Sequence, residues 1–311
     1  MLKVSRRISG PISHGLVVAG LLIGSVSAGP AASRAGAQEK QPEAQASKKE
    51  EPKAQEKSKM QEKPAPVVIT FSPAEKIVEF AILGYGGRPQ LDKVRSGIHE
   101  IGTIRLATDQ GDINGNYSFR SLKRDKSWED LIRVDLDLSP PAEASRQGVN
   151  SIKYTIAYNG ASIWSAQNNQ YVNSKPEVEA AFRAQLTHEY TALLRYREDG
   201  SKLELIGPET VVGVEANVIE LTTSQGEKTR FWVSTKSYRI LHAEYELKLV
   251  EGQPPTKYRV SYFYTPLKIV QNTLVPTRRV MSQDGKFVQE IIVTDFQYSA
   301  KLDPEVFQHL Q

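Results

Sequence analysis

The sequence predicts an α+β fold, in which a curved antiparallel β-sheet of about eleven strands has helices against its apolar face. Three stretches, 132–138, 241–249 and 257–264, alternate between apolar and polar residues. Successive side chains of a strand point to opposite faces, so each stretch has one apolar and one polar face. Antiparallel sheets commonly leave one face in water, and consecutive hairpins form a meander that curls as it twists.

Two helices are expected, at about 72–83 and 174–195. Each begins with a capping-box pattern, at 72–75 and at 174–177, in which serine and glutamate side chains bond to free N–H groups of the first turn. The apolar residues of the second helix fall on one side. The glycine-rich run 84–87 ends the first helix.

Strands account for most of the remaining chain. Turn dipeptides at Asn159-Gly160, Gln225-Gly226 and Asp284-Gly285 separate neighbouring strands, and a proline-containing run without periodicity at 139–150 predicts a mobile loop. The expected strands are 98–107, 113–122, 130–138, 153–158, 202–212, 214–222, 227–234, 238–250, 256–264, 274–282 and 286–298.

Residues 1–28 have the three parts of a secretory signal peptide. Three basic residues precede an apolar run at 16–26, and Val26-Ser27-Ala28 is a small-residue cleavage pattern. The apolar run is too short for an ordinary membrane span, and an uncleaved signal anchor is the alternative. The sequence contains no cysteine, which excludes lipoprotein acylation, disulfides and thiolate chemistry. We therefore expect a periplasmic protein that is not itself a lipoprotein.

The segment 29–66 is rich in Lys, Glu, Gln, Ala and Pro and has no aromatic residue, which predicts a disordered linker. Residues 67–311 are expected to form one β-rich domain. The whole chain has 40 basic and 36 acidic residues, but this domain has 29 and 30. Because the domain has no excess of positive charge, nothing indicates a nucleic-acid partner.

No arrangement of catalytic or metal-binding residues stands out. The four histidines after residue 28 lack metal-ligand spacing, and no Gly-x-Ser-x-Gly motif occurs. Asp135 with Asp137, and Glu244 with Glu246, share strand faces, but such pairs are more often part of a solvated face than a glycosidase site. We therefore expect no enzyme, no metal and no cofactor.

The apolar face of the predicted sheet is too extended for two short helices to fill, which predicts an apolar trough. The alternative is that helices and large side chains fill this face completely, and an aromatic candidate taken alone is more often an ordinary core residue than part of a ligand site. The residues predicted to line the trough are Trp128, Ile132, Val134, Leu136, Trp164, Phe182, Leu186, Phe231, Tyr245, Leu247, Tyr258 and Tyr262.

Several stretches have a recognisable order. SFRSLKRDKSWEDLIRV at 118–134 is followed by AYNGASIWS at 157–165, and then by FWVSTKSYRILHAEYEL, TPLKIVQNTLVPTRRV and TDFQYSAKLDPEVFQ. This order resembles the LolA and LolB family of periplasmic lipoprotein carriers, in which a Lys-Arg-Pro turn, a strand, a Ser-Asp-Gly hairpin with a nearby Trp and a final Asp-x-x-Phe segment follow one another. The resemblance covers roughly residues 70–308.

The resemblance implies an unclosed barrel with a helical lid over a hydrophobic cavity that takes up lipoprotein acyl chains. The helices at 72–83 and 174–195 would then be lid or plug elements. It also implies that Arg124, at the arginine of the family's turn, bonds to the lid and holds it shut. Asp125 replaces the family's proline, and a solvated turn arginine is the alternative for Arg124.

The leading hypothesis is a non-enzymatic periplasmic carrier or chaperone for lipids or lipoprotein acyl chains, in the manner of outer-membrane lipoprotein sorting. A carrier of this kind could also have partner proteins in the inner or outer membrane that donate or accept its cargo. The alternative is an envelope sensor or regulatory interaction module on the same fold. A hydrolase is the third hypothesis, and the absence of a nucleophile or metal pattern argues against it.

Overall fold

The computed structural model describes residues 70–109, 111–140, 145–146, 148, 150–249 and 252–308. The predicted signal peptide at 1–28 and linker at 29–66 lie outside these residues, as does part of the loop at 139–150. Those assignments stay predictions.

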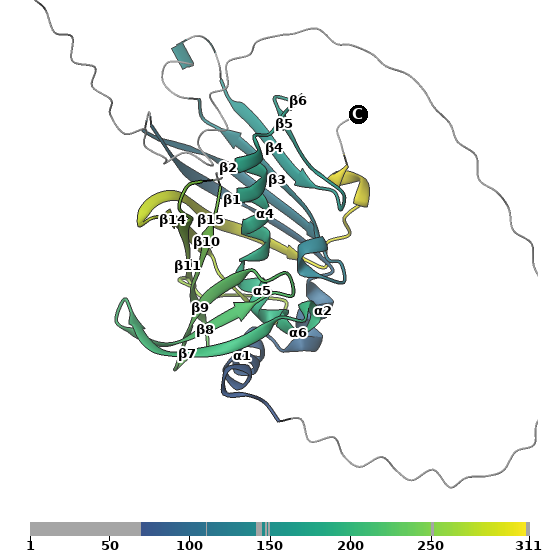
Figure 1. The fold of residues 1–311 in the computed structure, drawn as a ribbon. Coiled ribbons are helices and arrows are strands. Elements are labelled where there is room, and N and C mark those ends of the chain that lie inside the picture. The colour runs from purple at the N-terminus through teal and green to yellow at the C-terminus, as the bar shows by residue number, and fades with distance from the viewer. Residues whose placement is uncertain are drawn as a thin grey trace, which may run out of the picture. The chain divides into compact units, whose positions relative to one another are not determined.

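One antiparallel sheet of thirteen strands forms most of the domain (Figure 1). Its strand order is β6-β5-β4-β3-β2-β1-β15-β14-β11-β10-β9-β8-β7, so its two end strands are β6 and β7 and the sheet is unclosed. The α+β class and the unclosed curved sheet are therefore confirmed. The strands are β1 (Gly97–Thr108), β2 (Gly111–Leu122), β3 (Leu131–Leu138), β4 (Ile152–Tyr158), β5 (Ile163–Gln167), β6 (Gln170–Val172), β7 (Lys202–Val211), β8 (Val214–Thr222), β9 (Lys228–Ser234), β10 (Ile240–Leu247), β11 (Thr256–Phe263), β14 (Arg278–Gln283) and β15 (Lys286–Tyr298).

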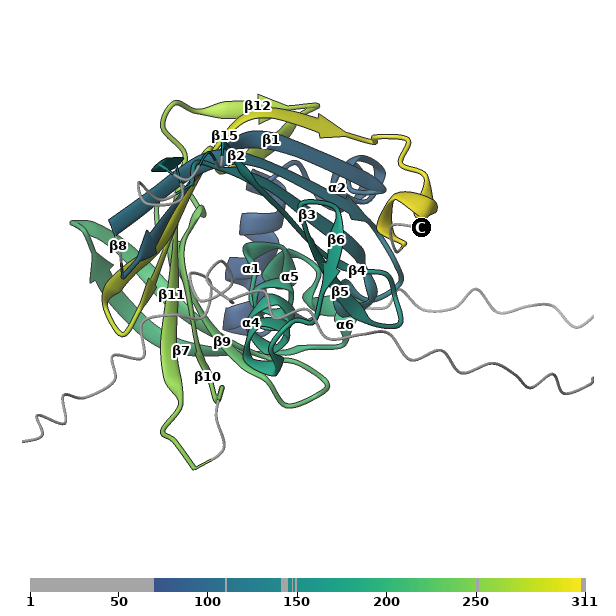
Figure 2. The same cartoon turned by 90° about the horizontal axis from the view of Figure 1, so that it is seen from above.

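The first and last strands of the sequence pair at the middle of the sheet (Figure 2). Their register shifts between Ile101 and Gly102, where β15 contributes one extra residue. A Cβ atom at Gly102 would lie only 2.0 Å from the carbonyl oxygen of Ile292, so the two backbones approach closely because this residue is glycine. Such a bulge bends the strand and increases its twist, and this helps to curve the sheet.

The first predicted helix is confirmed as α1 (Pro73–Gly84), with its capping box. The backbone N–H of Glu75 donates to the Ser72 hydroxyl at 3.2 Å, and the Ser72 N–H donates to the Glu75 carboxylate at 2.7 Å. A short helix that was not predicted, α2 (Arg88–Val94), follows at once. There are also two 3₁₀ turns among the described residues. The first, η2 (Ser127–Glu129), lies between β2 and β3, and the second, η3 (Pro304–Phe307), follows β15.

The prediction of one continuous helix at 174–195 is wrong. The structure has α4 (Pro176–Thr187), α5 (Tyr190–Leu194) and α6 (Tyr196–Asp199). Glu189 is extended, with φ −65° and ψ 154°, and it ends the first of these helices before the second begins. The second capping box is also absent, because Lys175 is the N-cap residue and the Ser174 hydroxyl bonds to Ser165 instead.

The strand prediction differs at two places. The chain after Asn159-Gly160 forms β5 and β6, two short strands that the sequence pattern does not show. The predicted strand 274–282 is divided at Pro276, which has no N–H for the ladder, so that β13 (Thr273–Val275) pairs with β12 (Lys268–Val270) in a separate two-stranded sheet.

Helices lie against the concave face of the sheet. Viewed from above, α1, α4 and α5 are placed between the β1–β6 half and the β7–β11 half of the curved sheet (Figure 2). None of the described helices is long and apolar enough to span a membrane.

Candidate functional site

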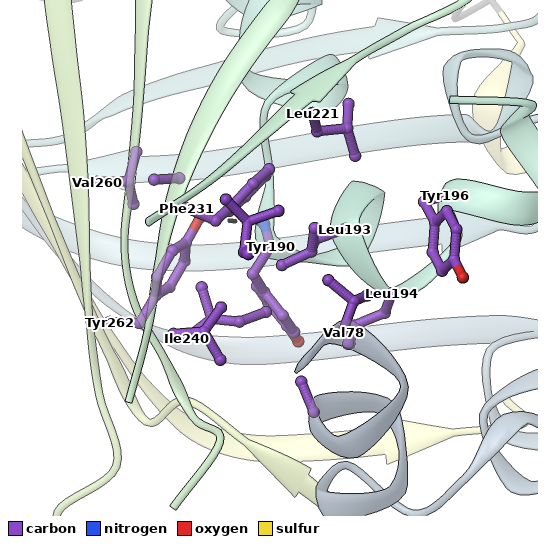
Figure 3. Packing of buried hydrophobic residues seen from close by; sticks show 14 of the residues in the cluster. Val78, Tyr190, Leu193, Leu194, Tyr196, Leu221, Phe231, Ile240, Val260 and Tyr262 are labelled. Carbon is purple, nitrogen blue, oxygen red and sulfur yellow. Dashed lines mark hydrogen bonds between the residues drawn. The ribbon is translucent and has the colours of Figure 1, made fainter. Parts of the chain in front are cut away.

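The two halves of the concave face are filled to different extents. Over β8–β11, side chains from α1 and α5 pack the sheet solidly, as Figure 3 shows around Leu193, Phe231 and Tyr262. Leu193 and Phe231 have no exposed surface. In this half the helices and large side chains fill the apolar face. This is the alternative to a trough that the sequence leaves open.

The other half contains a cavity between α4 and strands β1–β4. Its volume is about 180 Å³. A buried water occupies roughly 10–15 Å³ by this measure, so the space corresponds to roughly 12–18 waters, or about 360–540 Å³ of liquid. That is the lower end of the range of small-molecule pockets. Its apolar lining from β1–β4 consists of Ile98, Ile104, Leu106, Tyr117, Phe119, Ile132, Val134, Leu136, Leu138, Tyr154 and Ile156. Strands β10, β11, β14 and β15 add Tyr245, Val260, Met281 and Ile291.

The period of two in the strands explains why so many apolar residues meet here. Ile132, Val134 and Leu136 alternate along β3 and all face the cavity. The intervening Arg133 and Asp135 lie on the opposite face, where their side chains form an ion pair at 2.9 Å. One strand therefore contributes an apolar floor to the cavity and a charged outer surface.

Helix α4 forms the roof. Val178, Ala181, Phe182, Gln185 and Leu186 line the cavity, and their spacing is that of one helical face. Gln185 is the single amide in this stripe. The roof therefore presents mainly hydrocarbon to the strands below it.

A group of charged residues lines the cavity as well. Arg279 donates to Glu100 at 2.6 Å and to the Tyr117 hydroxyl at 3.1 Å, and both charged residues are buried. The Arg279 Nε has no hydrogen-bond partner among the described residues. Glu189, at the break between α4 and α5, lies near this pair, and burial raises the pKa of its carboxyl.

His188 lines the same cavity. Its Nδ1 lies 2.6 Å from the Thr229 hydroxyl, and its ring stacks on Tyr245 with 4.1 Å between centroids. Burial lowers the pKa of His188 to about 4, so the ring is neutral at pH 7. The described residues contain no group of three or more His, Cys, Asp or Glu side chains that could hold a metal ion.

The loop between β2 and β3 is fastened to α5 and α6. Arg195, which is 3% exposed, donates to Asp130 at 2.6 Å and to the main-chain oxygen of Arg124 at 2.8 Å. Ser127 bonds to the Asp199 carboxylate through both its N–H, at 2.9 Å, and its hydroxyl, at 2.5 Å. The cavity wall at this end is therefore held by an arginine from the helical segment.

That arrangement bears on Arg124, the residue expected to hold the lid. Its side chain is exposed, and among the described residues it makes no hydrogen bond or ion pair. Only its main chain takes part, since its N–H donates to Asp130 at 2.7 Å. The resemblance implied a bond from the Arg124 side chain to the helical segment. Here the helical segment supplies the arginine instead, because the Arg195 side chain donates to the main chain of the turn.

Six of the twelve residues predicted to line a trough line this cavity: Ile132, Val134, Leu136, Phe182, Leu186 and Tyr245. Whether any of them touches a ligand stays a prediction. Four others, Phe231, Leu247, Tyr258 and Tyr262, belong to the packed half, because they project from β9–β11 beneath α1 and α5. Trp128 lies in η2, partly exposed, with the Lys126 ammonium 5.9 Å from its ring.

Trp164 lies on the opposite face of the sheet. It pairs with Ala157 on β4, whereas the neighbouring Ile156 faces the cavity. The C-terminal turn η3 covers it there, and its indole N–H donates to the Phe307 carbonyl oxygen. Its large apolar surface is thus buried without contributing to the cavity.

Sequence reasoning missed the β1 residues Ile98, Ile104 and Leu106 and the charged residues Arg95, Glu100 and Arg279. The β1 residues alternate at even positions along a predicted strand, so the same period-of-two argument could have found them. No signal in the sequence places Arg95 or Arg279 at the cavity, because the first follows an unpredicted helix and the second lies on a strand whose start was misplaced by several residues.

The carboxylate pairs considered as catalytic candidates lie outside the cavity. Glu244 accepts bonds from Arg259 at 2.7 and 2.9 Å and pairs with Lys257 at 2.5 Å. Burial works to raise the pKa of Glu244, but the bonds from Lys257 and Arg259 lower it on balance. A carboxylate held ionised by two cations is suited to a structural ion pair, since a general acid at neutral pH needs a raised pKa.

No family model and no curated protein matches the chain. Solved structures are similar to it. A DUF1329 family protein from Desulfovibrio piger is 14% identical with a TM-score of 0.49, and the match covers 77% of this chain and 98% of that one. A domain described as an outer membrane lipoprotein-sorting protein domain, from Vibrio parahaemolyticus, is 14% identical with a TM-score of 0.49. The match covers 75% of this chain and 97% of that one.

A LolA superfamily protein from Nitrosomonas europaea is 18% identical with a TM-score of 0.47, and the match covers 76% of this chain and 97% of that one. The chain is similar to these LolA-like proteins in fold. The likeness concerns the fold alone.

Proposed function

We propose that this protein is a non-enzymatic periplasmic binding or carrier protein that holds an acyl chain of a lipid or lipoprotein in the cavity beneath α4. The observation that carries the proposal is the cavity itself: an unfilled space with a mainly hydrocarbon lining, in a domain whose other half is densely packed. An empty apolar space in a folded protein forfeits packing contacts, so it is retained where a ligand fills it.

The binding energy would come from apolar surface removed from water. Each buried methylene contributes about 0.8 kcal/mol, so ten methylenes contribute roughly 8 kcal/mol before the cost of immobilising the chain is subtracted. A single acyl chain therefore supplies useful affinity without any reaction. Helix α4 is the element expected to move to admit it, because it forms most of the roof and is followed by the break at His188 and Glu189.

Native mass spectrometry of protein purified from its own cell envelope without a delipidating step tests the proposal. We expect a reproducible adduct of lipid mass, which exchanges with an added fluorescent acyl-chain probe. A clean protein mass together with no uptake of the probe would contradict a carrier. In the same sample, a mature N-terminus directly after Ala28 would support export and signal cleavage, and retention of residues 1–28 would contradict the predicted cleavage.

A further inference from the structure

A buried arginine lines the cavity. Arg95 is the C-cap residue of α2, only 6% of its surface is exposed, and it faces the same space as Ile98 and Glu100 of β1. A guanidinium remains charged at all ordinary pH values, so burying it requires a compensating partner.

Arg95 lacks such a partner within the part of the chain that the structure describes. Its side chain makes no hydrogen bond and no ion pair there, in contrast to the other three cations of the cavity lining. Each of those three cations has a carboxylate partner. Arg279 pairs with Glu100 at 2.6 Å, Arg195 with Asp130 at 2.6 Å, and Lys123 with Asp92 at 2.8 Å and with Glu198 at 3.2 Å.

The acidic side chains of the lining do not balance Arg95. Glu100 and Asp130 are already paired, and the cation that acts most on Glu189 is Arg279. Lys123 is paired outside the lining, with Asp92 and Glu198, so Arg95 and Glu189 are the two charged residues of the lining for which the described residues show no ion pair. Burial raises the pKa of the Glu189 carboxyl, which favours its neutral form and leaves the charge of Arg95 uncompensated.

Arg95 acts electrostatically on three buried tyrosines, and one of them, Tyr190, lines the cavity with it. Burial raises the pKa of Tyr298 to about 12 and that of Tyr190 still further, and the charge of Arg95 acts against both shifts. The charge of Arg95 also acts against the raised pKa of Tyr85. Burial thus keeps these hydroxyls neutral, and none of them supplies a negative charge to Arg95.

We propose that the ligand of this cavity is an acyl chain with an oxyanion head group, and that the head group pairs with Arg95 while the chain lies along β1–β4 beneath α4. This inference rests on the proposed function and adds the chemical class of the ligand. The planar guanidinium matches a carboxylate or a phosphate in two-point geometry, and the attraction between the paired charges is stronger beside a mainly apolar lining than in water. The hydrocarbon lining then binds the acyl chain of the amphiphile, and the uncompensated charge of Arg95 binds its head group.

Equilibrium binding of three twelve-carbon ligands tests the head group: dodecanoate, dodecyl phosphate and the uncharged dodecanol. A hydrogen bond to a charged group predicts that the anionic ligands bind about ten- to a hundredfold more tightly than the alcohol. Arg95→Gln should remove this preference and leave the affinity for dodecanol nearly unchanged, and Arg95→Lys should keep part of it. Arg124→Gln removes an arginine from the exposed turn and should change neither affinity.

The outcomes separate this inference from the proposed function. Equal affinity of the native protein for acid and alcohol would overturn the role of Arg95 and leave the carrier intact. Binding of none of the three ligands would overturn both. Acetate or inorganic phosphate alone binding as tightly as the amphiphiles would show a site for free anions and overturn the amphiphile. If Arg95→Gln does not fold, the comparison of ligands on the native protein and on Arg95→Lys still decides.

Discussion

The indole N–H of Trp164 donates to the main-chain oxygen of Phe307 at 2.9 Å, across 143 residues of sequence. Arg133 strengthens the same junction, since its Nη1 donates to the Val306 oxygen at 2.9 Å and its guanidinium carbon lies 5.7 Å from the Trp164 ring. The C-terminal turn is therefore fixed to the convex face of β3–β5, on the side opposite the cavity.

Trp164→Phe should lower the free energy of unfolding by about 1 kcal/mol, because it removes one buried hydrogen bond and some packing. Acyl-chain binding should not change. Urea denaturation and probe binding on the same samples measure both quantities. Trp128→Phe is the matched control, and at this partly exposed position the stability should change by less than about 0.5 kcal/mol. A loss of binding in Trp164→Phe would contradict its placement outside the cavity.

The face on which Trp164 lies shows where the sequence pattern stops being informative. Alternation along β3 places Ile132, Val134 and Leu136 together without any knowledge of their neighbours. The face of a residue on β5 depends instead on its register with β4 across the Asn159-Gly160 turn, and a shift of one residue moves every side chain to the other face. A strand of five residues carries too little alternation to fix that register.

Arg195→Met should destabilise the protein by about 3–5 kcal/mol, because it leaves Asp130 buried without its partner. Burial already raises the pKa of Asp130 to about 6 although Arg195 and the Arg124 N–H hold the ionised form. Thermal or urea unfolding measures the change. Arg124→Met, in the exposed side chain of the same turn, should stay within about 0.5 kcal/mol. Similar losses in the two variants would show that Arg124 holds the helical segment after all.

Leu136→Trp should abolish acyl-chain binding while costing little stability, because the larger side chain enters the space beneath α4. Leu221→Trp is the counterpart in the packed half, where Leu221 is 1% exposed and no space is available. Overpacking there should cost about 1–3 kcal/mol or more, and the folded fraction should still bind the probe. Unfolding free energy and probe affinity distinguish the two halves. Equal destabilisation would mean that the cavity closes in solution.

The sequence predicts an unfilled region but gives no prediction of its location. The argument compared the area of the sheet with two helices, and that comparison gives no reason to favour one half. The choice is made by α1 and α5, whose side chains pack in one cluster with strand residues far away in sequence, as Val78 and Leu193 do with Ile240. Local patterns carry no information about such pairings, so Phe231 and Tyr262 were indistinguishable from cavity residues.

His188 gives the protein a pH dependence whose sign can be derived. The residue is 4% exposed, and burial lowers its pKa to about 4, whereas an exposed histidine titrates near pH 6.5. Between these values the unfolded chain binds a proton that the folded protein does not. Stability should therefore fall as the pH decreases from about 6.5 to 4, by on the order of 3 kcal/mol from this residue, and level off below pH 4.

Asp130 acts in the opposite direction, since a folded-state pKa of about 6 makes the native protein bind a proton before the unfolded chain does. The contribution of His188 is therefore best isolated by comparing the native protein with His188→Gln, whose amide can still bond to Thr229. Asp130, and His242 with its pKa also lowered to about 4, are present in both proteins and cancel. Urea unfolding at a series of pH values should give curves that converge towards acid pH, because only the native protein loses the His188 contribution. Parallel curves would show that His188 has the same pKa in the folded and unfolded states, and with it that the wall of the cavity is open to water at this point.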